Sequence, residues 1–312
     1  MVATVSGTLL VYKKPLVRWL VAEGASLPAD YATDQVRREL EVIVGSVAAS
    51  DQIRFKAPNS EEPYWTLTHA NGHVELLRVG ELTPFRDNLN ILDIFAVIRE
   101  LHVEMLAGHT GEWIYLVAGA LCLVLSVTGI ILWWPTRRMF RWRWIWPKPF
   151  RLSLSLQYHR HSGAFFVLAL IVIVLTGCIM LWQKLVMPLL PPTPVTQVKV
   201  TSGLSADRSV PQAAKLLALA IEQIPDGWPT YIRLPSDNSS EASFRFQLSN
   251  EWHPNGRTSV KIDEVSGEMI VSQRSDEAPA SRRLLNQVYP LHSGYGMNEI
   301  YMFAVLLTGV SL

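Results

Sequence analysis

The sequence has little cysteine. Its two cysteines, Cys122 and Cys178, both lie in the middle of apolar runs, so we expect them to act as small apolar side chains. This position argues against a disulfide framework and against a cysteine metal site. Hydrophobic residues make up 49% of the 312 residues, and 11 residues are tryptophan. Soluble domains rarely combine these two features, so the composition favours a membrane protein.

Several enzyme motifs are missing as well. The sequence has no Ser/His/Asp arrangement, no HExxH, no phosphate-binding glycine loop and no dinucleotide fingerprint. We therefore expect that any nicotinamide or flavin that supplies electrons binds outside this sequence.

Charge is absent from two long stretches. Residues 113–134 and 164–182 are uncharged, approach or exceed the ~20 residues that cross a bilayer as a helix, and end in tryptophan. Residues 2–12 and 300–312 resemble the last half and the first half of two further spans. The simplest explanation is that the sequence lacks a piece at each end. The alternative is a pair of short re-entrant or interfacial segments.

The segment between the two complete spans has no acidic residue. Residues 135–160 carry arginines and lysines at seven positions, and short basic loops stay in the cytoplasm. Tryptophans between these cations could stack on nucleic acid, but beside two spans they favour contact with anionic lipid. The rule predicts that residues 13–100 and 187–289 lie outside the cytoplasm.

Both exported segments share one plan. A helix is predicted over residues 32–47, followed by strands near 52–56, 64–69 and 73–79, with a strong hairpin signal at Asn71-Gly72. In the second segment a helix that starts near Pro211 precedes four alternating stretches. These stretches are residues 230–234, 243–248, 258–262 and 268–272. The sequence therefore predicts two small α+β domains.

Histidines recur where chain segments enter the spans. His102 lies on the flank of an amphipathic stretch, and His292 precedes the last apolar run on the same predicted side. Two neutral imidazoles at one depth on facing helices are what axial ligation of a haem iron requires. A histidine at a membrane edge more often only anchors the interface, but recurrence at three helix entrances favours ligation. We expect His69, His73 and His253 to lie on the surface.

A third candidate, His159, lies at the cytoplasmic end of its helix. His159 and His161 are about 200° apart on a helix, so at most one of them faces a given ligand. His109 competes with His102 in the same way, and Gly108 and Gly111 suggest a bend near it.

The apolar segments also share a small residue followed by glycine. This pair occurs at Ser6-Gly7, Thr128-Gly129, Thr176-Gly177 and Thr308-Gly309. Small residues let helix backbones approach closely in lipid, so we expect Gly129 and Gly177 to pack the bundle.

Several of these motifs together resemble a known family. The sequence resembles the PepSY-associated transmembrane family at LHVEMLAGHTGEW (101–113), TGIILWWPTRR (128–138), QYHRHSG (157–163), DEVSGEM (263–269) and PLHSGYG (290–296). That family includes iron-regulated inner-membrane proteins and ferric-siderophore reductases. The resemblance implies haem ligation by His102, His159 and His292, with His109 and His161 as secondary candidates. The family's first-helix histidine and most of its fourth helix have no counterpart in this sequence.

We therefore expect a helical membrane bundle of about four helices, the first and last incomplete, with two exported α+β PepSY-like domains. The predicted segments are the end of the first membrane helix (1–12), an exported domain (13–100), the second helix with its amphipathic part (101–134), a basic loop (135–158), the third helix (159–186), a PepSY-like domain (187–289) and the start of the fourth helix (290–312).

The expected function is that of a haem-binding oxidoreductase of the bacterial inner membrane, similar to a ferric-chelate reductase. One or two haem b groups would carry electrons to a ferric siderophore in the periplasm, for iron uptake. The donor would be a quinol or a cytoplasmic reductase, and membrane lipid, but no nucleic acid, would be a partner. The alternative is a membrane-anchored PepSY protein that binds or regulates a periplasmic peptidase or sensor. A transporter subunit is disfavoured because the complete spans carry no charged residue and no proline-broken helix.

Overall fold

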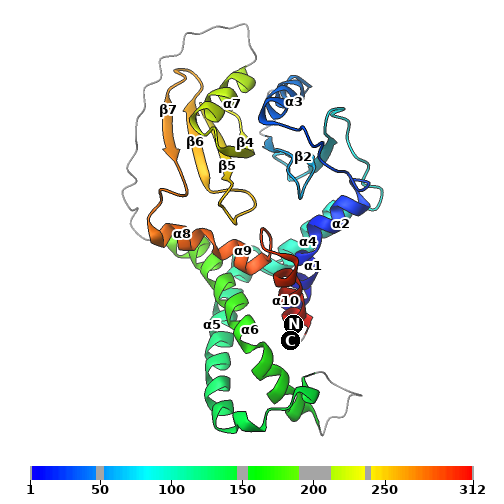
Figure 1. The fold of residues 1–312 in the computed structure, drawn as a ribbon, viewed down its shortest axis with the longest axis vertical. Helices are drawn as coiled ribbons and strands as arrows, with labels where there is room; N and C mark the ends of the chain where they lie inside the picture. The colour runs from blue at the N-terminus through cyan, green and yellow to red at the C-terminus, as the bar shows by residue number, and fades with distance from the viewer. Residues whose placement is uncertain (1, 47–52, 146–153, 190–211, 236–239, 311–312) are drawn as a thin grey trace. The chain divides into compact units, whose positions relative to one another are not determined.

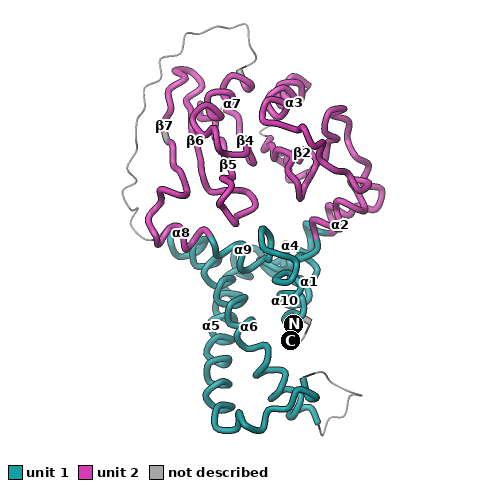
Figure 2. The backbone as a smooth tube through the Cα atoms, viewed as in Figure 1, with its two compact units in different colours: residues 1–12, 95–193, 287–312 teal, residues 13–94, 194–286 magenta. Residues whose placement is uncertain are grey.

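The computed structural model describes residues 2–46, 53–145, 154–189, 212–235 and 240–310 (Figure 1). The chain folds into two compact units, and each unit is built from separate segments of the sequence (Figure 2). Unit 1 contains residues 1–12, 95–193 and 287–312, and unit 2 contains residues 13–94 and 194–286.

Unit 1 is helical throughout its described residues. Its helices are α1 (Val2–Val11), most of α4 (Ile91–Glu104), α5 (Gly108–Trp133), α6 (Ser155–Leu185), α9 (Val288–Ser293) and α10 (Glu299–Val310), together with the short 3-10 turns Trp134–Met139, Trp142–Trp144 and Met187–Leu189. In the described part of the chain, the helical stretches Gly108–Met139 and Ser155–Leu189 are long and apolar enough to cross a membrane. The two predicted spans are thus confirmed as helices of sufficient length and apolarity to cross a bilayer.

A sharp bend joins α4 to α5, as the two glycines suggested. Met105 and Leu106 have positive φ angles of 54° and 56°, which side chains other than glycine rarely adopt. A Cβ atom on Gly111 would lie 1.7 Å from the carbonyl oxygen of Glu104, so the turn leaves no room for a side chain there. The Tyr115 hydroxyl donates a 2.9 Å hydrogen bond to the carbonyl oxygen of Leu101. The bend therefore fixes α4, which carries His102, against the start of α5.

Small residues bring the helices of unit 1 together, but only some of them lie at the predicted positions. A Cβ on Gly119 would lie 2.5 Å from the Cys178 sulfur, so this cysteine fills space between α5 and α6. Gly309 of α10 meets Thr8 of α1 in the same way. Nothing lies within 4 Å of the Cβ position of Gly129, so the predicted packing role of that glycine is wrong for the described residues. Gly177 of α6 packs against the imidazole of His292, which belongs to α9.

Unit 2 is an α+β unit. Its elements are α2 (Lys13–Leu20), α3 (Thr33–Ser46), β1 (Arg54–Lys56), β2 (Tyr64–Thr68), β3 (Val74–Arg78), α7 (Gln212–Gln223), β4 (Gly227–Arg233), β5 (Glu241–Leu248), β6 (Thr258–Asp263), β7 (Met269–Gln273) and α8 (Ala280–Asn286). Among the described residues, seven strands form one sheet in the order β3-β2-β1-β4-β5-β6-β7, and every neighbouring pair is antiparallel.

The core of unit 2 lies on one face of this sheet. Strand residues alternate, and those pointing to one side, such as Trp65, Phe244 and Phe246, are fully buried. They share a single cluster with the apolar sides of α3 and α7, including Leu40 and Leu217. The helices therefore cover one face of the sheet, and the other face carries the polar residues of the same strands.

The two segments that the sequence predicts to be exported keep their helix-then-strand plan, but they form one sheet instead of two separate domains. β1 from the first segment pairs with β4 from the second, with Phe55 opposite Ile232 and Arg54 opposite Arg233. The predicted hairpin is confirmed at Asn71-Gly72, where Gly72 has a φ of 86°. The turn before β7 ends at Gly267, with a φ of 65°.

We predict that two cysteines introduced on opposite sides of the β1–β4 junction form a disulfide. Arg54→Cys and Arg233→Cys place two thiols on directly opposite residues, and facing residues of an antiparallel pair lie within the range that a disulfide spans. In a background with Cys122→Ala and Cys178→Ala, cleavage at a protease site inserted between residues 146 and 153 should leave the two fragments joined until reduction.

The matched control pairs Arg54→Cys with Lys261→Cys. Lys261 lies on β6, beyond β4 and β5, and neighbouring strands are ~4.8 Å apart, so this pair should not join. Fragments that separate for both pairs would contradict a single sheet.

Candidate functional site

His102 of α4 is held by the neighbouring helix α1. Its Nδ1 lies 2.9 Å from the carbonyl oxygen of Ala3, and because a carbonyl only accepts, Nδ1 carries the proton and donates. The Ser6 hydroxyl lies 3.2 Å from the same nitrogen and donates its own hydrogen to the carbonyl oxygen of Val2. These contacts select the neutral tautomer in which Nε2 keeps its lone pair.

His292 of α9 has the same arrangement against α6. Its Nδ1 donates to the carbonyl oxygen of Ile173 at 3.0 Å, and the Thr176 hydroxyl lies 3.2 Å from it. The Thr176 hydroxyl donates to the carbonyl oxygen of Val172 at 2.7 Å. Each imidazole is therefore anchored by one carbonyl and one hydroxyl, and Nε2 of neither ring has a hydrogen-bond partner in the described part of the chain.

A glycine makes each anchor accessible. Gly7 lies four residues after Ala3, and Gly177 lies four residues after Ile173. In a helix a side chain leans back over the preceding turn, so a glycine leaves the carbonyl of that turn open to an outside donor. A Cβ on Gly7 would lie 2.8 Å from Cε1 of His102, and one on Gly177 would lie 3.1 Å from Cε1 of His292. The rings occupy the space that side chains would fill.

The two anchored imidazoles lie next to each other. Their ring centroids are 6.0 Å apart and their planes differ by 40°. Metal–imidazole bonds of about 2 Å, with each ring centre roughly 1 Å behind its nitrogen, put the centres of two axial imidazoles about 6 Å apart. The observed separation fits one metal ion bound between the rings.

The number of protein ligands at the site limits which kind of metal group it could hold. Among the described residues, no group of three or more His, Cys, Asp or Glu side chains has an arrangement that could hold a metal ion. A bare ion normally needs more protein ligands than two imidazoles. A haem brings its own in-plane nitrogens and needs only axial ligands, so His102 and His292 fit a haem better than a bare ion.

The structure places the other candidate histidines apart from this pair. His161 is buried, with Nδ1 2.8 Å from the Gln157 carbonyl oxygen and Nε2 3.3 Å from that of Met139, and its ring stacks on Phe140. His159 is exposed on α6 and has no hydrogen bond or ring contact with another described residue. His161 thus ties α6 to the turn after α5, and no second imidazole faces His159 among the described residues.

His109 belongs to a polar group at the start of α5. Its Nδ1 lies 3.4 Å from the carboxylate of Glu112, and its Nε2 accepts from the indole of Trp113. Glu112 is 1% exposed and forms an ion pair with Lys184 near the end of α6. This ion pair joins the ends of the two apolar helices. His109 is exposed and contacts the carboxylate of the pair.

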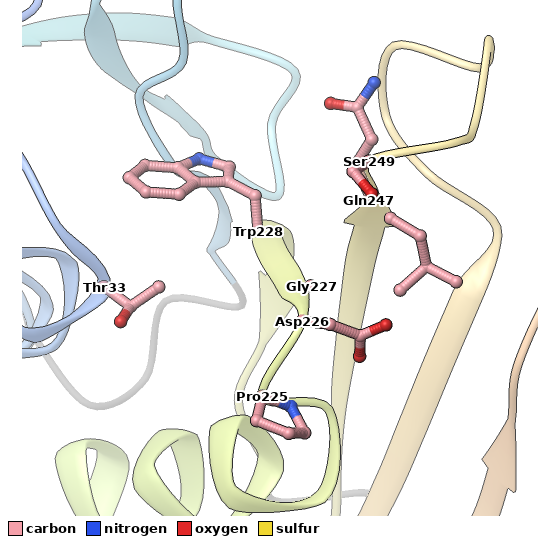
Figure 3. Close-up of a pocket in the computed structure, with 8 residues that line it drawn as sticks. Thr33, Pro225, Asp226, Gly227, Trp228, Gln247 and Ser249 are labelled. Atoms are coloured by element: carbon pink, nitrogen blue, oxygen red, sulfur yellow. The ribbon is translucent and has the colours of Figure 1, made fainter.

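Unit 2 contains a hollow of its own. It has a volume of about 480 Å³ and is lined by residues that include Thr33, Trp228 and Gln247 (Figure 3). Two of its polar groups already have partners. Asp226 binds Arg274 through two hydrogen bonds, and the Trp228 indole donates to the Pro58 carbonyl oxygen. The residues that line the hollow include no histidine and no cysteine, and the carboxylate of Asp226 is engaged by Arg274.

Several of these roles were not predicted from the sequence. Ser6, Gly7, Thr176 and Gly177 form the histidine anchors, and the repeated small residue with glycine was the signal that pointed to them, although we assigned it to helix packing. The predicted surface position of His253 is wrong, because its side chain is only 4% exposed.

Together the fold and the site define a membrane protein whose helical bundle holds two facing imidazoles and whose polar segments build one α+β unit. The chain belongs to the family described as the PepSY-associated TM region, whose model matches residues 1–312. A comparison with curated proteins finds no significant match.

Proposed function

We propose that His102 and His292 would hold a haem b, which would supply one-electron transfer to ferric iron outside the cytoplasm. The observation that carries this proposal is the pair of equivalently anchored imidazoles, 6.0 Å apart. When bound between two histidines, haem supplies one-electron transfer without an open position for oxygen.

The chain's own residues fix the ligands. The bonds from Nδ1 to the carbonyl oxygens of Ala3 and Ile173 hold each ring in place and make each Nε2 more basic. The two carbonyls belong to α1 and α6, so the spacing between the rings depends on how these helices are held in the bundle. These hydrogen bonds limit the movement of both rings, which would favour fast electron transfer through a bound haem.

The orientation of the protein in the membrane is inferred from the basic loop. Residues 135–158 contain arginines and lysines without an acidic residue, which supports a cytoplasmic loop in a bacterial inner membrane. Unit 2 would then lie in the periplasm, where a ferric siderophore arrives. One electron converts Fe³⁺ to Fe²⁺ in the chelate, which weakens its hold on the iron. The electron comes from a quinol or a cytoplasmic reductase outside this chain.

The first test is the absorption spectrum of the detergent-purified protein, produced with haem supplied, before and after dithionite. We expect the sharp reduced bands of a six-coordinate b-type haem. His292→Ala removes one axial ligand and should abolish or shift these bands, whereas His159→Ala should leave those of this haem unchanged.

Two outcomes would count against the proposal. An unchanged spectrum in His292→Ala would exclude His292 as a ligand. A featureless spectrum from well-folded, haem-supplied protein would favour the non-catalytic alternative, in which unit 2 binds or regulates a periplasmic peptidase or sensor.

A second prediction concerns the glycine anchors. Gly177→Ala places a methyl group about 3.1 Å from Cε1 of His292 and should displace the ring from the Ile173 carbonyl. Changes behind a metal ligand typically weaken binding about tenfold or more, so haem occupancy should fall and the reduced bands should broaden.

Gly129→Ala is the matched control, because it follows a threonine in the same way and has open space around its Cβ position. It should leave the spectrum unchanged. If Gly177→Ala behaves like Gly129→Ala, the anchor does not support the ligand.

A further inference from the structure

The face of the unit 2 sheet that α3 and α7 leave uncovered carries more basic than acidic side chains, although Glu241 and Asp263 also lie on it. Strand residues on this face alternate with the core residues, and the pairing register places them in rows across the sheet. One row runs through Arg54, Arg233, Ser243 and Lys261. We call these residues, together with Lys56, Tyr231 and Arg245 of the next row, the basic face.

At the centre of the basic face two arginines lie directly opposite each other. Arg54 of β1 pairs with Arg233 of β4, and both side chains are exposed. Neither side chain has an ion pair or hydrogen bond with another described residue. The segments next to them in the chain, 47–52 and 236–239, lie outside the described residues. Like charges directly opposite on a sheet are destabilising, so the fold does not account for this pair.

The adjoining row adds two cations around an aromatic ring. The Lys56 ammonium and the Arg245 guanidinium each lie 5.7 Å from the centre of the Tyr231 ring. Glu62 neutralises part of this charge. Burial alone would raise the pKa of Glu62, but Lys56 and Lys14 outweigh it and lower the pKa to about 2. Lys261 pairs with Glu241 at 3.0 Å. These ion pairs engage Lys56 and Lys261. Arg54 and Arg233 have no ion pair with another described residue.

A buried histidine beside this face supports a positive local potential. Burial, together with the nearby charges of Arg257, Arg245 and Lys14, lowers the pKa of His253 to about 3. The imidazole therefore stays neutral at physiological pH and adds no charge. The excess charge is carried by the exposed arginines, which remain available to a ligand.

We propose that the basic face docks an anionic ferric chelate of the catecholate class. A tris-catecholate complex of Fe³⁺ carries a net negative charge and presents flat aromatic rings. Guanidinium groups pair with anionic oxygens and stack on aromatic rings, and Tyr231 offers a further ring between Lys56 and Arg245. A neutral hydroxamate complex lacks the charge that this face matches. The inference rests on the proposed function and names the substrate class for it.

The test is calorimetric titration of the full-length protein in neutral detergent with the gallium(III) tris-catecholate complex. Gallium(III) is not reduced, so binding is measured without any electron transfer. Arg233→Gln removes a charge-assisted contact and should weaken binding about tenfold, and Arg54→Gln should do the same. Added salt should weaken wild-type binding. The neutral gallium(III) tris-hydroxamate complex should bind more weakly and respond to neither substitution.

Arg38→Gln is the matched control, because Arg38 is exposed on α3, over the opposite face of the sheet. It should leave the affinity unchanged. Equal weakening by Arg38→Gln and Arg233→Gln would indicate a general charge effect and overturn the proposal, as would unchanged binding in Arg233→Gln. Arg233→Gln should unfold no earlier than wild type, since it relieves a repulsion, so lost binding is separable from misfolding.

The two proposals fail in different ways. If the gallium complex binds at the basic face but the protein shows no haem bands, docking stands and the electron-transfer function falls. If haem bands depend on His292 but no catecholate binds, the substrate class is wrong and the redox function stands.

Discussion

The hydrogen bond from an imidazole Nδ1 to a backbone carbonyl of a neighbouring helix is the interaction on which the candidate site depends. Within a helix such a carbonyl is already used by the amide four residues later, so an outside donor must reach its second lone pair. Gly7 and Gly177 make that approach possible, because no side chain covers the carbonyls of Ala3 and Ile173. The hydroxyls of Ser6 and Thr176 turn toward their own helices and offer a second acceptor.

The same order of elements occurs twice in the chain, and this explains why the site is symmetric. In each half an apolar helix is followed by a helix with strands, a histidine-bearing helix and another apolar helix. In unit 1, the two histidine-bearing helices bring His102 against His292. In unit 2, the first strands of the two halves, β1 and β4, pair antiparallel. Contacts between corresponding elements are characteristic of a two-fold arrangement, and here two halves of one chain provide them.

Local patterns in the sequence predicted the helices and strands, but they did not predict contacts between residues that are far apart in the chain. The helix over 32–47 and the strand 243–248 were found because their periodicity is local, and they match α3 and β5 closely. The pairing of Phe55 with Ile232 joins residues far apart in the chain, and no local pattern encodes it. The burial of His253 was missed for the same reason, since the polar residues around it resemble an exposed turn.

The histidine pair was predicted only in part. His102 and His292 were placed at similar depth by topology alone, because the spans fix the level of whatever flanks them. The role of Gly177 required knowing which side chain fills the space beside it, and only the tertiary structure gives that. Gly129 also follows a threonine but faces open space, so the motif by itself did not distinguish a glycine that accommodates an imidazole from one that does not.

Energetics explain how unit 2 tolerates two facing arginines at its central junction. A like-charge pair on a sheet costs about 1 kcal/mol or less at an exposed position. Burying a large apolar side chain contributes about 1.5–3 kcal/mol, and both Phe55 and Ile232 are buried at the same junction. Burial therefore outweighs repulsion, and the junction forms with the arginines in place. The repulsion between Arg54 and Arg233 therefore does not prevent folding, and their charge is consistent with the proposed recognition of an anion.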